Sequence, residues 1–144
     1  MARALAPMSS PVSHLGQLIR TMHPLLNPGC YVFASLPLGT AIDVDMVVAF
    51  VRESDGLSVV LKEEDAIRLG LPVVFRAAWI TLTVHSDLEA VGLTAAFSAA
   101  LARANIGCNV IAGTRHDHIF VPYAAAGEAM QALLRLQASA DPTR

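Results

Sequence analysis

The stretch WITLTVHSDLEAVGLTAAFSAALARANIGCNVIAG, residues 79–113, decides the fold of this chain. It opens with a strand-like run and passes through a polar turn into a helical segment. Leu93, Phe97 and Leu101 recur at the spacing of one buried helical face. This pattern predicts an amphipathic helix over about residues 92–104, and an apolar strand follows it. The order of elements is therefore strand, helix, strand.

The flanking sequence extends this order in both directions. Towards the C-terminus we expect two strands joined by TRHD (114–117) and a last helix over about 124–137. Towards the N-terminus we expect a helix from Ser13, a strand over 30–36 and a hairpin around the Asp-Gly pair at 55–56. Such a pair accepts the positive φ values of a tight turn. A short helix and a long strand are expected to connect this hairpin to residues 79–113.

The second half therefore reads βαββα and the first half αβββαβ. This order predicts an α+β fold of two ferredoxin-like units, each with helices on one face of an antiparallel sheet. We expect a loose start at 1–12, a first unit at 13–76, a second unit at 77–138 and a tail at 139–144. The second unit lacks a closing strand, and residues 29–36 are expected to complete its sheet. Such an exchange would join units of about 70 residues, which are marginal alone.

Composition disfavours several classes of protein. The chain has 144 residues, is 54% hydrophobic and carries a formal charge of -2. Its few basic residues form no stripe interleaved with aromatics, so no nucleic-acid partner is expected. No apolar run approaches the ~18–20 residues of a membrane span and no signal-peptide pattern occurs, so the expected location is cytoplasmic and no membrane partner is expected. Cys30 and Cys108 are predicted to be buried thiols.

The turn before the predicted helix at 92–104 has the chemistry of a carboxylate-binding site. The first N–H groups of a helix are unpaired and carry a partial positive charge. Gly92 has no side chain, so a ligand could approach its backbone closely. Ser86, Asp87, Glu89 and Thr94 surround the same point, and Asp87 or Glu89 could pair with an ammonium group. The structural alternative is a glycine that permits a tight turn and a Ser or Asp that caps a helix.

The sequence RHDH (115–118) permits several interpretations. In an alternating strand, His116 and His118 point to one face and Asp117 to the other. Two such histidines, with His85 as a third, could bind a metal, but nothing else completes a ligand set and no metal is predicted. No nucleophile pairs with a histidine base, so no catalytic residue and no cofactor are predicted. The remaining interpretation is a hairpin end in which Asp117 bonds turn amides.

Residues 79–113 resemble the opening of an ACT domain, a small amino-acid-sensing regulatory module. Gly92, the helix after it and NIGCNVIAG (105–113) match the family's glycine turn, helix and apolar strand. The fuller set VHSDLEAVGLTAAFSAAL, CNVIAG and HDHIFVP is similar to a group of small bacterial tandem-ACT proteins, related in architecture to the regulatory regions of aspartate kinases. This likeness spans most of residues 14–137. The first half departs from the pattern because it lacks a full helix after its first strand.

The resemblance implies a non-enzymatic regulatory protein that binds a small molecule, an amino acid, where the 86–94 turn meets a neighbouring ACT unit. The ligand's carboxylate would bind amides near Gly92, an acidic side chain would bind its ammonium, and the RHDH hairpin would help line the pocket. The implied ligand-binding residues are Ser86, Asp87, Glu89, Ala90, Val91, Gly92, Leu93, Thr94, His116 and Asp117.

The resemblance also implies side-by-side pairing of ACT sheets, either between the two halves or in a homodimer. Two alternatives remain open. One is a small metal- or His-dependent enzyme that uses the HDH hairpin. The other is a structural regulatory subunit that docks on another enzyme.

Overall fold

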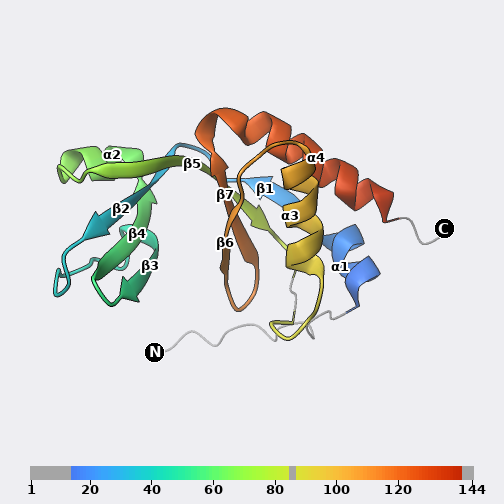
Figure 1. Cartoon of the computed structure of the whole chain (residues 1–144), viewed down its shortest axis with the longest axis horizontal. Coiled ribbons are helices and arrows are strands. Elements are labelled where there is room, and N and C mark those ends of the chain that lie inside the picture. Colours follow the sequence, from blue (N-terminus) through green and yellow to red (C-terminus); the bar gives the residue numbers. More distant parts are fainter. Residues whose placement is uncertain (1–13, 85–86, 141–144) are drawn as a thin grey trace, which may run out of the picture.

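The computed structural model describes residues 14–84 and 87–140 (Figure 1). The N-terminal part contains α1 (Leu15–Thr21), β1 (Pro24–Leu26), β2 (Tyr31–Leu36), β3 (Val47–Glu53), β4 (Gly56–Lys62) and α2 (Glu63–Arg68). The C-terminal part contains β5 (Val73–Leu82), α3 (Leu93–Arg103), β6 (Asn109–Ala112), β7 (Asp117–Pro122), a 3-10 turn η1 (Tyr123–Ala125) and α4 (Ala126–Ser139). The predicted α+β class, the hairpin at 55–56 and the helix before Asn105 are confirmed.

The described strands form one antiparallel sheet in the order β3-β4-β2-β5-β7-β6. The long strand β5 joins its two halves. The first part of β5 pairs with β2, where Tyr31 lies opposite Ala77, and the second part pairs with β7, where Trp79 lies opposite Phe120. Figure 1 shows β5 running between a lobe that contains β2, β3, β4 and α2 and a lobe that contains the remaining helices.

The start of the chain contributes a strand to the C-terminal half, but the strand differs from the predicted one. β1 pairs with the end of β5, with Pro24 opposite Leu82, whereas residues 31–36 pair with β4 and with the start of β5. The turn after β1 separates the two strands and includes Gly29 at φ 97. β1 has three residues and begins with a proline, so it lacks the length and alternation that would have shown it in the sequence.

The helix α1 also lies with the C-terminal half, because it contacts α3 and α4. The predicted boundary between residues 76 and 77 therefore falls inside β5, and residues 15–26 pack away from the rest of the predicted first unit. One core cluster lies between α1, α3, α4 and one face of the sheet, and includes the fully buried Leu18, Phe97, Leu101, Ile119 and Leu133.

The N-terminal half has a smaller core under α2. Val32, Val59 and Leu61 of the sheet pack with Ala66 of α2. Residues 37–46 contain turns and no helix, as the sequence predicts. Both cysteines are free and half-buried rather than buried, because each lies in the turn just before its strand.

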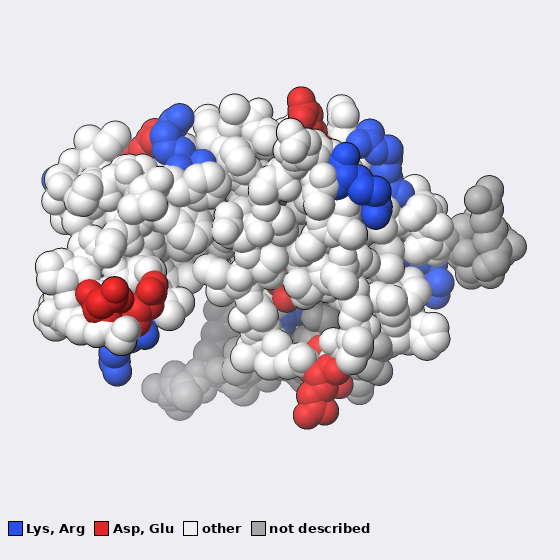
Figure 2. Space-filling model, in the orientation of Figure 1, with Lys and Arg blue, Asp and Glu red and all other residues white. Residues whose placement is uncertain are grey.

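The charged residues form no extended patch on the face shown in Figure 2, where they lie in small separate groups. Among the helices of the described residues, none is long and apolar enough to cross a membrane.

Candidate functional site

The predicted turn leads directly into α3. Ser86 lies outside the described residues, together with His85. The Asp87 carboxylate accepts a hydrogen bond from the Glu89 N–H at 2.9 Å, and the Asp87 carbonyl accepts one from the Ala90 N–H at 2.9 Å. Asp87 therefore shapes the turn, which is the structural role that the sequence left open.

Gly92 takes the left-handed conformation that L side chains rarely adopt, with φ 107 and ψ -18. A Cβ added there would lie 3.0 Å from Cδ2 of Leu15 in α1. The space beside its Cα is therefore filled by Leu15. Gly92 permits the turn and the close approach of α1, and a ligand would meet the helix end from another side.

That other side is a small cavity at the first turn of α3. It has a volume of about 80 Å³ and is lined by Asp87, Leu88, Ala90, Leu93, Thr94, Ala112 and Asp117. The first hydrogen bond inside the helix runs from the Ala96 N–H to the Gly92 carbonyl. The N–H groups of Leu93 and Thr94 therefore have no acceptor within the helix.

The cavity brings together five of the residues implied by the resemblance: Asp87, Ala90, Leu93, Thr94 and Asp117. Glu89, Val91, Gly92 and His116 do not line it. It also contains Leu88 and Ala112, which the sequence analysis did not select. Ala112 lies opposite Asp117 in the β6–β7 hairpin. The pairing register of that hairpin could therefore have identified Ala112 as a neighbour of Asp117.

Asp117 is a buried acidic residue at this site, with 8% of its surface exposed. Burial raises the pKa of its carboxyl group, and the nearby His118 and His116 partly oppose that rise. A cationic group placed in the cavity would stabilise the charged form of this carboxyl. The site therefore combines a helix N-terminus that favours an anion with a carboxylate that favours a cation.

Asp117 and His118 lie on opposite faces of the sheet, as the alternation of a strand predicts. Asp117 faces the α3 cavity, while His118 packs against Trp79 on the opposite face of the sheet, with ring centroids 5.7 Å apart. Nδ1 of His116 lies 3.4 Å from the carbonyl oxygen of Val84. Within residues 14–84 and 87–140, no three His, Cys, Asp or Glu side chains gather as metal ligands would.

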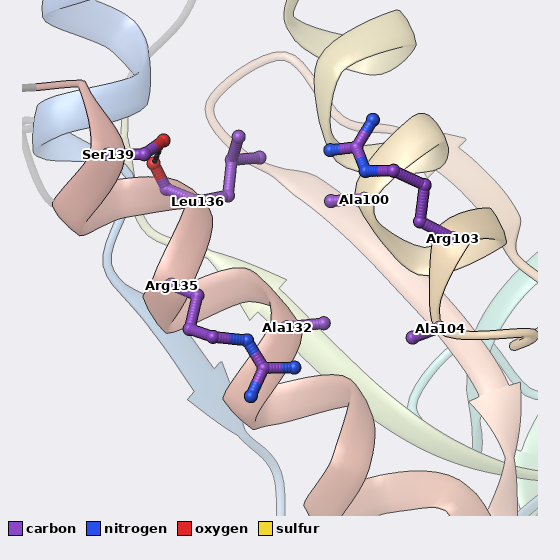
Figure 3. Close-up of a pocket in the computed structure, with 7 residues that line it drawn as sticks. All are labelled: Ala100, Arg103, Ala104, Ala132, Arg135, Leu136 and Ser139. Atoms are coloured by element: carbon purple, nitrogen blue, oxygen red, sulfur yellow. Dashed lines mark hydrogen bonds between the residues drawn. The ribbon is translucent and has the colours of Figure 1, made fainter.

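A larger, open groove lies between α3 and α4 (Figure 3). Alanines line its floor, and Arg103 and Arg135 reach into it from the two helices. Arg103 occupies the last turn of α3, where the helix carries a partial negative charge. The negative end of the helix therefore explains the presence of Arg103, and no bound ligand is needed to explain it.

The two thiols lack the features of nucleophiles. Burial raises the pKa of Cys30, and the Glu63 carboxylate raises it further. Burial likewise raises the pKa of Cys108. Reactive cysteines need a lowered pKa, so neither side chain is activated in this structure.

The fold and cavity define a class of protein: a small α+β chain with two ferredoxin-like halves and a small cavity at the N-terminus of α3. Family models described as "ACT domain" match residues 10–78 and residues 74–135. The chain belongs to the ACT-domain family.

Solved structures agree with this assignment. A protein of unknown function from Vibrio cholerae, described as a possible transport protein, is 44% identical with a TM-score of 0.77, and the match covers 85% of this chain and 95% of that one. A protein from Agrobacterium tumefaciens is 21% identical, with a TM-score of 0.62 and coverage of 79% and 87%. The regulatory subunit of aspartate kinase from Thermus flavus shares the fold at 10% identity, with a TM-score of 0.57 and coverage of 81% and 98%. No curated protein matches the sequence.

Proposed function

We propose that this protein is a non-enzymatic, cytoplasmic regulator that binds an amino acid in the cavity at the N-terminus of α3. ACT domains are typically regulatory modules that bind small molecules. The observation that carries the proposal is the position of Asp117, whose carboxyl lines the same small cavity as the first turn of α3.

An amino acid has the two charges that this cavity favours. Its carboxylate would accept hydrogen bonds from the N–H groups of Leu93 and Thr94, where the helix is partly positive. Its ammonium group would pair with Asp117. The pairing would lower the raised pKa of this carboxyl, so binding would relieve the cost of burying its charge.

The size of the cavity supports a ligand that is only partly enclosed. Its volume of about 80 Å³ is about half that of an apolar cavity of about 150 Å³ that encloses a benzene molecule. The charged head of an amino acid would lie inside and its side chain outside. We therefore propose that a neighbouring ACT unit, from a homodimer or from an enzyme partner, completes the site. Ligand binding could regulate that contact only by favouring one arrangement over another.

Two sheet edges that are free among the described residues support such a contact. β3 and β6 end the strand order, and β3 carries the exposed apolar side chains of Phe50 and Val51. Unpaired edges are sites where a second chain can add strands. Light scattering at several protein concentrations, with and without ligand, will measure the assembly.

Thermal unfolding against the twenty amino acids tests the binding proposal. A ligand at 100 times its dissociation constant adds about 2.7 kcal/mol. This gain should raise the midpoint by several degrees, at roughly 2–8 °C per kcal/mol for small domains. Asp117→Asn should abolish the shift. Glu89→Gln, which removes a charge from the same turn but not from the cavity, should preserve it.

Two results would contradict the proposal. If no amino acid raises the midpoint at millimolar concentration, the protein does not bind this class of ligand by itself. If Asp117→Asn responds like the wild type, an amino acid binds elsewhere on the chain.

A further inference from the structure

The face of the sheet opposite α1, α3 and α4 has its own aromatic cluster. Tyr31, Val60 and Phe120 are buried in it, and Trp79 is half-buried. Trp79 packs edge-on to Tyr31 with centroids 5.1 Å apart, and nearly parallel to Phe120 at 6.2 Å. No described helix belongs to this cluster, so the sheet itself must bend to bury these rings.

A cavity opens beside this cluster, between the two halves of the molecule. Val48 and Ala49 of β3 form one wall, Ile111 and Gly113 at β6 form another, and Trp79, His118 and Phe120 lie between them. Its volume is about 180 Å³. Figure 1 shows β3 and β6 on the facing sides of the two lobes, and Figure 2 shows the surface hollowed between these lobes. None of its lining residues lines the cavity at α3.

His118 lines this cavity, and a hydrogen bond from Trp79 fixes which ring nitrogen carries its proton. Nε1 of Trp79 donates to Nδ1 of His118 at 3.1 Å. An indole N–H can only donate, so Nδ1 is the acceptor and the proton of the neutral ring is on Nε2. The Thr81 hydroxyl accepts a hydrogen bond from Asn27 at 2.9 Å, lies 3.4 Å from Nδ1, and can donate its own proton to Nδ1 in this tautomer.

Nε2 of His118 lies on the side of Gly113, 3.2 Å from the point where a Cβ of that residue would be. Gly113 therefore leaves room for the imidazole next to the cavity. Burial lowers the pKa of His118, and His116 lowers it further while Asp117 opposes the shift. At neutral pH the imidazole is thus uncharged, and it offers an N–H donor and no positive charge.

We propose that this cavity binds a single-ring aromatic molecule that carries one hydrogen-bond acceptor, with the ring against Trp79 and the acceptor on Nε2–H of His118. The apolar walls exclude charged groups, because among the described residues no Asp, Glu, Lys or Arg lines the cavity to pair with them. The size agrees with one ring, since an apolar cavity of about 150 Å³ binds benzene. This site would act independently of the amino-acid site.

The single tryptophan makes the test direct. Trp79 is the only tryptophan in the chain, so one indole N–H resonance reports on this cavity in an NMR titration. The two probes are acetophenone and ethylbenzene, which have similar shapes, but only the first has a carbonyl acceptor. Both should shift the Trp79 resonance saturably. Acetophenone should bind about 2- to 12-fold more tightly, as one neutral hydrogen bond provides.

Three variants separate the contributions. His118→Phe should remove the preference for acetophenone, and Ala49→Leu, which fills the cavity from β3, should weaken binding of both probes. Glu64→Gln in the first turn of α2 should leave both affinities unchanged, since Glu64 does not line this cavity. Amide spectra will confirm that each variant is folded.

Two results with the wild-type protein alone would overturn the proposal, whether or not the variants fold. One is the absence of a saturable shift of the Trp79 resonance with either probe. The other is equal affinity for acetophenone and ethylbenzene, which would show that His118 donates no bond to the ligand.

Discussion

The two halves of the sheet are built on the same plan, but only one has a full layer of helices. In the C-terminal half, α1, α3 and α4 cover one face and bury a large core. In the N-terminal half, α2 alone contributes a buried helical side chain, Ala66. The small cavity at the N-terminus of α3 lies where this helix meets β6 and β7. A larger, open cavity of about 430 Å³ lies at the N-terminus of α2, where Lys62, Glu63 and Glu64 line it. The comparison shows that a helix N-terminus alone does not make an anion site. The first turn of α2 carries Glu63, Glu64 and Asp65, whereas the first turn of α3 carries no acidic residue.

The loop at residues 37–46 replaces that helix in the N-terminal half. Ile42 packs against the core there, but an apolar cavity of about 170 Å³ remains between this loop and the sheet. Close packing leaves few voids larger than a water molecule in a protein core. The N-terminal half is therefore covered loosely, and we expect it to contribute less to the stability of the chain.

Two phenylalanine substitutions give the largest expected difference between the halves. Phe97 in α3 is fully buried, whereas Phe50 on β3 is 47% exposed. Phe97→Ala should lower the free energy of unfolding by about 3–5 kcal/mol, the range for a large side chain lost from a core. Phe50→Ala should cost about 1 kcal/mol or less. Urea unfolding will measure both, and equal losses would show that the two halves are packed equally well.

A smaller effect is expected where α1 joins the C-terminal half. Gly92→Ala should cost about 1–3 kcal/mol, since alanine at φ 107 is strained and its Cβ would contact Leu15. Gly107→Ala is the control, because Gly107 is exposed and has no atom near the added methyl group. It should be neutral or slightly stabilising. Similar losses at the two positions would mean that the Gly92 turn is not required.

Much of the fold could be predicted because its signals are local. The spacing of Leu93, Phe97 and Leu101 gave α3, and the Asp-Gly pair at 55–56 gave the β3–β4 hairpin. The pairing of β1 with β5 could not be read in this way. β1 is three residues long, and its partner lies more than fifty residues away in the sequence. β1 also contacts α4, the last described helix, so its position depends on distant contacts that local patterns do not reveal.

The candidate site shows the same limit. The turn at the start of α3 was visible in the sequence, and Asp87 and Thr94 do line the cavity. The packing role of Gly92 could not be predicted, because it depends on a contact with Leu15 in α1, far earlier in the sequence. Strand alternation predicted that Asp117 and His118 lie on opposite faces of the sheet. The register of β7 with β5, which the sequence did not reveal, decides that Asp117 is the one that faces α3.

Removing the charge of Asp117 should increase the stability of the folded protein modestly. Because burial raises the pKa of its carboxyl, the folded state holds a proton that the unfolded state releases as the pH rises above about 3.9. The contribution of the protonated Asp117 carboxyl to the stability of the fold is therefore complete below that pH. It is lost as the pH rises through the pKa of this carboxyl in the folded state. Asp117→Asn should be more stable than the wild type at pH 7, by less than about 2 kcal/mol.

Thermal unfolding at pH 7 and at pH 3 will measure this gain, which should disappear at the lower pH. A variant that is less stable than the wild type at pH 7 would show instead that the Asp117 carboxylate is stabilised by its surroundings. In that case the cavity would not favour a cationic group.

The smallest effect concerns the contact that joins α2 to β5. Glu63, in the first turn of α2, forms an ion pair with Arg76, and the Arg76 guanidinium also lies 5.2 Å from the centre of the Tyr123 ring. The hydrogen bond from Arg76 lowers the pKa of Glu63. The contribution of this pair is thus present above the unfolded pKa of about 4.3 and is lost as the pH falls through the folded pKa. Since both side chains are partly exposed, the contribution should be small and should fall in 1 M salt.

The control for this pair lies one residue further along the chain. Glu63→Gln and Glu64→Gln each remove a carboxylate from the first turn of α2, but Glu64 forms no ion pair among the described residues. At pH 7 and low salt, Glu63→Gln should lower the thermal midpoint more than Glu64→Gln, and 1 M salt should remove the difference. A difference that persists in 1 M salt would mean that Glu63 holds α2 by packing. The loosely covered half would then be fixed to β5 in the same way as the C-terminal half, and the contrast between the two halves would be smaller than their helices suggest.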